Sequence, residues 1–214
     1  MRENGTPRLW SVRDVDHGTV PASDLPLLTE IVRWSREFLV PGHPELGRTG
    51  PVCPYTKPSQ QRNLFYLTVL RGVRGIAEIG ARVQELRRHY EELAGTLAEN
   101  ERQLLTFLLL LPEFDPEDAT PLDDLQRQAK PDFVASGLMI GQFHPTCEAP
   151  GLWNPDFRPL RAPVPLLAIR RMLAADLPFL LDSDGSLDAY LARFAPAIPA
   201  RARAQLAGRL VGAG

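Results

Sequence analysis

The chain has 214 residues, 44% of them hydrophobic, so it can bury one substantial core and is expected to form a single domain. Its formal net charge of -2 gives no electrostatic argument for nucleic acid or an anionic membrane as a partner. The two cysteines lack a C-x-x-C spacing, and no apolar run is long enough for a signal peptide or a membrane span. We therefore expect a cytoplasmic protein with free thiols.

The first half of the chain predicts an arm, a helix, a long loop and a strand. Residues 1–22 are expected to be an irregular arm. Apolar spacing after the capping residues Ser23 and Asp24 predicts a helix that ends near Val40. Residues 41–58 hold five prolines and three glycines, which indicates a loop. The aromatic and β-branched run over residues 63–72 predicts the first strand.

The following segments alternate between helix and strand. Apolar residues at steps of three and four predict an amphipathic helix from Ile76 to Leu97. The short apolar run "LLTFLLLL", which Pro112 ends, predicts a second strand. Thr120 and Pro121 then open another helix, because they supply a cap and a first helical residue.

The last part of the chain predicts two strands and two helices. The segments "GLMIGQFH" and "PLLAIRRM" are the third and fourth strands, and a final alanine-rich helix is expected from about Pro199 to Leu210. The predicted fold is α/β (α+β), a single domain over residues 23–214. Its central sheet is mixed or antiparallel, has about four strands and is flanked by helices.

The two proline-rich loops hold four side chains that bind soft metal ions, His43 and Cys53 in the first and His144 and Cys147 in the second. "HPTC" has an H-x-x-C spacing that suits zinc, so a four-ligand zinc site is one interpretation. A nucleophilic Cys53 paired with a histidine is another. The simplest is that Cys53 is a small buried hydrophobe.

A haem site is the further interpretation of the second loop. His144 ends an apolar strand as a candidate axial ligand, and Gly141 leaves room for a flat group. Arg158 and Arg161 have the charge that propionates or an amino-acid carboxylate would need, and Trp153 is a candidate cover of the site. The alternative is that His144 is a hydrogen-bonded core residue, Trp153 packs, and both arginines lie on the surface.

The motifs of the two loops resemble those of the YqcI/YcgG family. That family typically has a Pro-Cys motif before its first strand and a Gly-x-His-Pro strand end, and this chain has "GPVCPY" at Cys53 and "FHP" at His144. The likeness covers roughly residues 50–172 and departs where Thr146 begins "TCE" in place of Ser-Ser-Arg. "HPELGRTGPVCP" and "GLMIGQFHP" are also similar to stretches of small bacterial proteins from natural-product biosynthesis genes.

The resemblance implies a haem-dependent oxidoreductase that oxidises an amine nitrogen of an amino-acid-like substrate. His144 is then the axial ligand, or Cys53 as a thiolate, and Arg158 and Arg161 bind carboxylates. His43 and Cys53 are candidate catalytic residues in a loop that covers the open face. The alternatives are a non-redox small-molecule-binding or accessory protein that uses the same pocket, and an interaction protein. A homodimer through the C-terminal helices is also considered.

Overall fold

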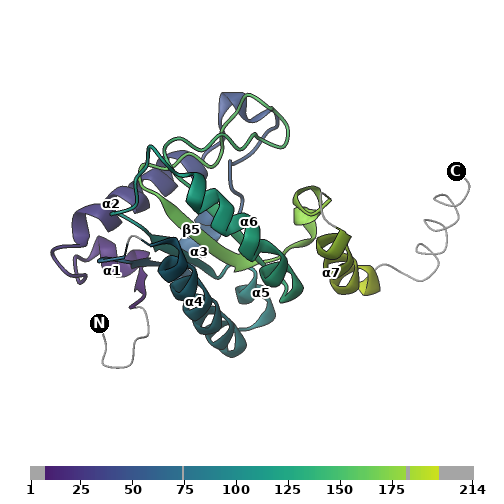
Figure 1. The fold of residues 1–214 in the computed structure, drawn as a ribbon, viewed down its shortest axis with the longest axis horizontal. Helices are drawn as coiled ribbons and strands as arrows, with labels where there is room; N and C mark the ends of the chain where they lie inside the picture. The colour runs from purple at the N-terminus through teal and green to yellow at the C-terminus, as the bar shows by residue number, and fades with distance from the viewer. Residues whose placement is uncertain (1–7, 74, 182–183, 198–214) are drawn as a thin grey trace, which may run out of the picture.

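The computed structural model describes residues 8–73, 75–181 and 184–197, and an open five-stranded sheet lies at its centre (Figure 1). The strand order is β1-β2-β3-β5-β4. β2 and β3 are parallel, whereas the other three pairs are antiparallel. The sheet was predicted to be mixed or antiparallel with about four strands, and it is mixed, with one short strand more than expected. The strands are β1 (Trp10–Ser11), β2 (Phe65–Val69), β3 (Thr106–Leu110), β4 (Leu138–Phe143) and β5 (Leu166–Arg171).

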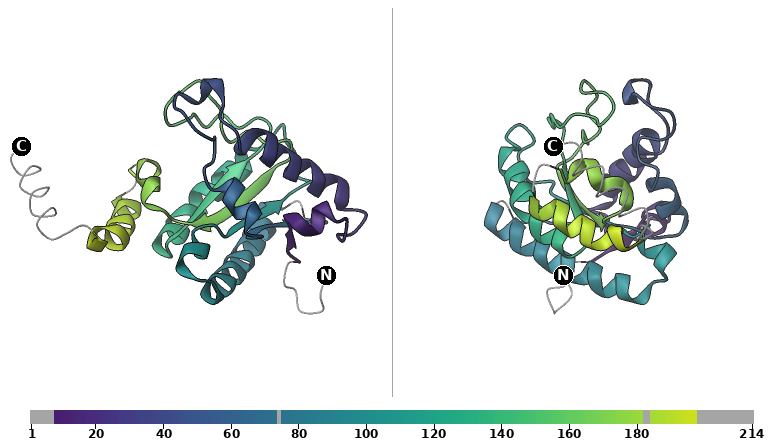
Figure 2. Two further views of the ribbon diagram at one scale, coloured as in Figure 1. Left: turned by 180° about the vertical axis from the view of Figure 1, so that it is seen from behind. Right: turned by 90° about the vertical axis from the view of Figure 1, so that its right-hand side faces the viewer.

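Helices cover both faces of the sheet, with α1 and α2 on one side and α4 and α6 on the other (Figure 2). The helix α4 connects the parallel strands β2 and β3, as a crossover of this kind requires. The helices are α1 (Val12–Asp16), α2 (Leu25–Trp34), η1 (Ser35–Leu39, a π-helix), η2 (Pro44–Leu46), α3 (Thr56–Gln61), α4 (Ile76–Thr96), α5 (Glu99–Arg102), α6 (Thr120–Ala135), η3 (Ala174–Phe179), α7 (Asp184–Phe194) and η4 (Ala195–Ala197).

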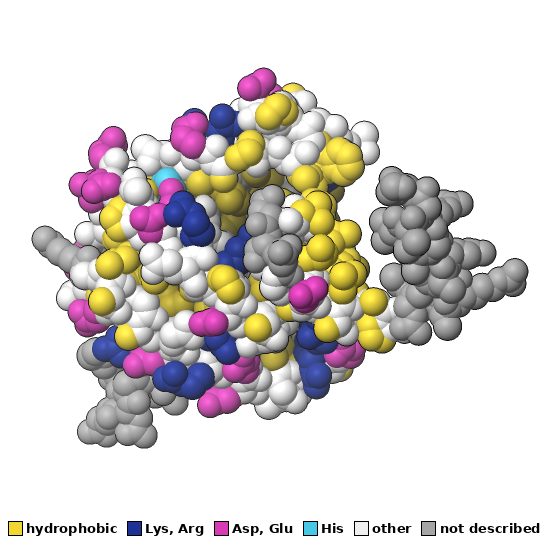
Figure 3. Space-filling view, turned by 45° about the vertical axis from the view of Figure 1, so that its right-hand side comes forward, with side chains coloured by type: hydrophobic (Ala, Val, Ile, Leu, Met, Phe, Trp, Pro, Cys, Tyr) yellow, Lys and Arg dark blue, Asp and Glu magenta, His cyan; other side chains and the backbone are white. Residues whose placement is uncertain are grey.

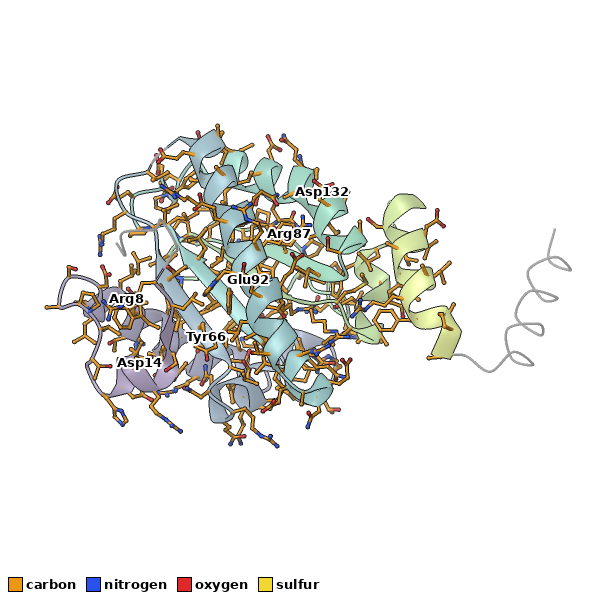
Figure 4. All side chains as sticks on the ribbon, turned by 90° about the horizontal axis from the view of Figure 1, so that it is seen from below. Arg8, Asp14, Tyr66, Arg87, Glu92 and Asp132 are labelled. Carbon is orange, nitrogen blue, oxygen red and sulfur yellow. The ribbon has the colours of Figure 1, made fainter. Side chains whose placement is uncertain are left out.

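Alternating strand positions fill two cores. Phe107 of β3 and Ile169 of β5 belong to the core under α4 and α6, whereas Leu108 of β3 belongs to the core under α1 and α2. This division follows from the two-residue repeat of a strand. Arg87 of α4 reaches toward α6 and donates to Ser136 Oγ at 2.8 Å, so a polar contact links the two helices beside the first core (Figure 4).

Part of the expected irregular N-terminal arm is ordered, which corrects that prediction. β1 pairs with β2, and Trp10 and Val15 are buried in the core. Ser11 begins α1 with a capping box, because its hydroxyl accepts from the Asp14 N–H at 3.2 Å and its own N–H donates to the Asp14 carboxylate at 2.8 Å. A two-residue strand and a five-residue helix are too short to show a hydrophobic period.

The longer predicted elements are confirmed within a few residues. The helix expected to end near Val40 is α2 continued by η1, and the Val40 N–H donates to Ser35 O at the end of the π-turn. The alanine-rich helix expected from about Pro199 lies outside the described residues. None of the described helices is both long enough and apolar enough to cross a membrane.

Candidate functional site

The two proline-rich loops form one lobe above the sheet, termed the loop lobe (residues 41–54 and 145–162; Figure 1). The rings of His43 and Phe157 stack at 4.8 Å, and Asn154 Nδ2 donates to Glu45 O at 2.7 Å. Gly47 has a φ of 77°, and a Cβ there would lie 2.7 Å from a backbone oxygen of the opposite loop. Only glycine fits this contact.

His43 and Trp153 belong to the loop lobe, and the structure does not bring them together at one reaction centre. His43 Nδ1 accepts the Glu45 N–H at 3.2 Å, and its ring lies 6.0 Å from that of Phe38. Trp153 is 63% exposed and does not line the pocket on the sheet that is described below. The expected roles of His43 in catalysis and of Trp153 as a cover therefore receive no support from their positions.

Arg158 and Arg161 bind a carboxylate of the chain itself. Arg158 Nε donates to Glu148 Oε2 at 3.2 Å, and Arg161 Nη2 donates to Glu148 Oε1. The hydrogen bonds from Arg158 and then from Arg161 lower the pKa of Glu148. The glutamate that replaces part of the expected Ser-Ser-Arg stretch thus occupies the two arginines that were predicted to bind propionates.

His144 is enclosed in a hydrogen-bonded network on the α6 side of the sheet and is 2% exposed. Its Nδ1 lies 3.1 Å from Thr146 Oγ1, and its Nε2 lies 3.1 Å from Asp123 Oδ1. Thr146 Oγ1 also donates to Pro116 O at 2.9 Å, which extends this network to the loop before α6.

This network does not fit an axial haem ligand, because both ring nitrogens of His144 already have partners. Cys147 is 1% exposed, and burial raises the pKa of its thiol. Within the described ranges no cluster of three or more His, Cys, Asp or Glu side chains has the geometry of a metal site. The four donors considered for zinc are therefore not brought together.

A cavity of about 340 Å³ lies on the opposite face of the sheet and is termed the sheet pocket. In its floor Gly141 of β4 is paired with Ala168 of β5, which in turn is paired with Leu108 of β3. Gly141 has no side chain and Ala168 has only a methyl group, so the floor is hollow between larger neighbours such as Phe143 and Leu166. A cavity of this volume is within the range of about 300–1,000 Å³ found for small-molecule sites.

The roof of the sheet pocket comes from segments far away in sequence. Four of its lining residues come from two segments: Trp34 and Leu39 belong to the α2–η1 helix, and Cys53 and Tyr55 precede α3. Phe179 of η3 also lines the cavity. Figure 3 shows hydrophobic side chains gathered in a hollow below the loop lobe, which agrees with this lining.

Arg170 lines the sheet pocket and is held by a buried carboxylate. Its Nη1 and Nη2 donate to the two carboxylate oxygens of Asp176 at 2.7 and 2.6 Å, and Asp176 is 3% exposed. Desolvation acts to lower the pKa of Arg170, but the hydrogen bonds and charge of Asp176 outweigh it, and the net shift is upward. Cys53 and Tyr55 add to that upward shift, which places both within electrostatic range of the guanidinium.

Other polar side chains also line this cavity, and they include Lys130 and Thr56. Lys130 of α6 lines it and donates from Nζ to Phe179 O at 2.7 Å. Thr56 is 4% exposed and also lines the cavity. The charged side chains that line the sheet pocket in this part of the chain, Lys130 and Arg170, are both cations.

Of the predicted site residues, Gly141 and Cys53 line the sheet pocket, whereas His43, His144 and Trp153 do not. Arg158 and Arg161 are likewise absent from its lining. The sequence reasoning missed Lys130 and Arg170. Arg170 could have been found from the sequence, because it occupies an inward-facing position of the apolar strand over residues 166–171. A charged residue at such a position requires a buried partner.

Comparison with known proteins gives one family. The family model described as Domain of unknown function (DUF6875) matches residues 28–205, most of the chain. No curated protein and no solved structure matches the chain. The matched range includes every residue of the sheet pocket.

Proposed function

The chain belongs to the DUF6875 family, and from that premise we propose that it binds a compact, largely apolar small molecule with a negatively charged group in the sheet pocket. The observation that carries the proposal is the floor made by Gly141 and Ala168, with apolar walls and with Lys130 and Arg170 as the charged lining. Such a combination of a preformed apolar cavity and a few convergent polar groups is typical of ligand sites.

The expected affinity follows from the area that a ligand would bury. An aromatic group that loses about 150 Å² of apolar surface gains roughly 4 kcal/mol, and one ion pair with a cation of the pocket adds to this. Association itself costs several kcal/mol, so we expect dissociation constants from about micromolar to millimolar. An aromatic or aliphatic carboxylate, including a derivative of an amino acid, has the required composition.

A haem protein is the second candidate, and it would require a ligand other than His144. Cys53 is the one of the four expected soft donors that lines the sheet pocket, and Lys130 and Arg170 have the charge that propionates need. Haem bound through a thiolate would supply oxygen or peroxide activation. The cavity volume is near the lower end of the usual range, which favours a compact ligand over a tetrapyrrole.

Thermal unfolding in the presence of benzoate, cyclohexanecarboxylate and their neutral amides tests the proposal. We expect the carboxylates to raise Tm in a concentration-dependent manner and the amides to raise it less. Ala168→Leu fills the hollow floor and should abolish the shift. The matched control is Ala77→Leu, at an exposed position of α4, which should keep it. Equal shifts in both variants, or no shift with any carboxylate, would show that the proposal is wrong.

A titration with haemin separates the second candidate from the first. A Soret band that Cys53→Ala removes and that His144→Gln retains would support haem bound in the sheet pocket. Spectra that do not change on addition of the protein would eliminate haem and leave the carboxylate proposal intact.

A further inference from the structure

The two cysteines of the chain have contrasting surroundings. Cys147 is 1% exposed and lies outside the sheet pocket. Cys53 is half-buried and lines the sheet pocket. The chain therefore contains a thiol that a pocket ligand can reach and a buried thiol that serves as an internal comparison.

The backbone holds Cys53 in this position. Its N–H donates to Leu39 O at 2.8 Å, and the N–H of Val52 donates to Pro41 O at 2.8 Å. These two bonds tie the loop segment before α3 to the end of η1. The thiol thereby shares the cavity with Arg170, which lies on the floor strand β5.

Arg170 and Thr56 line the same cavity as Cys53, and Arg170 has hydrogen-bonding capacity left for a ligand. A guanidinium has five N–H donors. Arg170 uses one on Arg171 O and two on Asp176 within the described residues, so two remain. A carboxylate accepts from such donors, so its carbon skeleton would lie in the same cavity as the sulfur.

We infer that Cys53 is a nucleophilic thiol directed at an electrophilic carboxylate held in the sheet pocket, an inference that rests on the proposed function. The step is S-alkylation. A bond forms between sulfur and the electrophilic carbon, the bond from that carbon to its leaving group breaks, the leaving group departs with its electron pair, and the thiol proton passes to water. The pocket cations accelerate the step because they concentrate and orient the anionic reactant next to the sulfur.

Competition between iodoacetate and iodoacetamide tests the inference, with intact-mass and peptide mass spectrometry as the readout. We expect modification of Cys53 and not of Cys147 in the folded protein. The rate ratio of iodoacetate to iodoacetamide at Cys53 should be about tenfold higher in the folded chain than in the chain unfolded in urea. Lys130→Met should reduce this ratio, whereas Lys57→Met, at an exposed position outside the sheet pocket, should leave it unchanged.

Three results would overturn the inference: equal modification of the two cysteines, the same rate ratio in the folded and unfolded chains, or unaltered Cys53 labelling in Ala168→Leu. The shift in Tm that carboxylates cause in Cys53→Ser distinguishes a failure of this inference from a failure of the proposed function. If Cys53→Ser keeps the Tm shifts and the iodoacetate-to-iodoacetamide rate ratio at Cys53 is the same in the folded and unfolded wild type, only the inference is refuted. Loss of the shifts from both the wild type and Cys53→Ser refutes the proposed function as well.

Discussion

Asp176→Asn should lower the free energy of unfolding by roughly 2–3 kcal/mol. The Asp176 carboxylate accepts two bonds from Arg170 and one from the Leu173 N–H at 2.7 Å. Removal of one partner from a buried ion pair costs about 3–5 kcal/mol, because the other charge stays uncompensated. The Asp176 side chain is 5% exposed and that of Arg170 is 29% exposed, so solvent screening reduces this cost by about a third.

Guanidinium denaturation followed by circular dichroism measures this loss as a lower midpoint with an unchanged slope. The matched control is Glu37→Gln, because Glu37 pairs with Arg33 and both side chains are more than 60% exposed. We expect the control to change stability by less than about 0.5 kcal/mol. If Asp176→Asn costs no more than the control, the ion pair does not hold Arg170, and the reasoning about the polar group of the sheet pocket is wrong.

Two further predictions concern other parts of the fold. Gly137→Ala should cost about 1–2 kcal/mol in denaturant unfolding, because φ is +74° and the new Cβ would lie 2.3 Å from Arg193; Gly95→Ala, in open space on α4, should instead stabilise slightly. Burial raises the pKa of Tyr90, so the folded state keeps a proton that the unfolded state loses above about pH 10. The free energy of unfolding should therefore fall as pH rises past that value, and Tyr90→Phe should flatten the decline.

Local patterns were sufficient to predict the long elements of this fold. α4 was predicted from its apolar stripe and α6 from Thr120 and Pro121, because periodicity and capping depend on neighbours within one or two turns. The strands over residues 138–143 and 166–171 were predicted from their apolar character. β1 was missed, because its position depends on pairing with β2 and not on a pattern of its own.

The functional site was harder to predict, because it depends on strand register and on which side chains become partners. Gly141 was expected to leave room for a flat group, and in the fold it lies opposite Ala168 in the floor of the sheet pocket. His144 has the right residue type for a ligand, but its face of the sheet meets α6 and Asp123. The sequence contains Glu148, yet its pairing with the two nearby arginines became evident only from the fold.

The position of β5 between β3 and β4 has a consequence for the order of folding. β4 precedes β5 in the chain but pairs only with it in the described sheet, so β4 has no strand partner until the later segment has inserted beside β3. Closure of such loops costs entropy before the new contacts repay it, and non-local pairing of this kind folds slowly. During synthesis the apolar strand over residues 138–143 therefore remains open to misassociation until the ribosome releases Arg171. Since the cavity floor is this strand pair, ligand-binding capacity should arise only at that final stage.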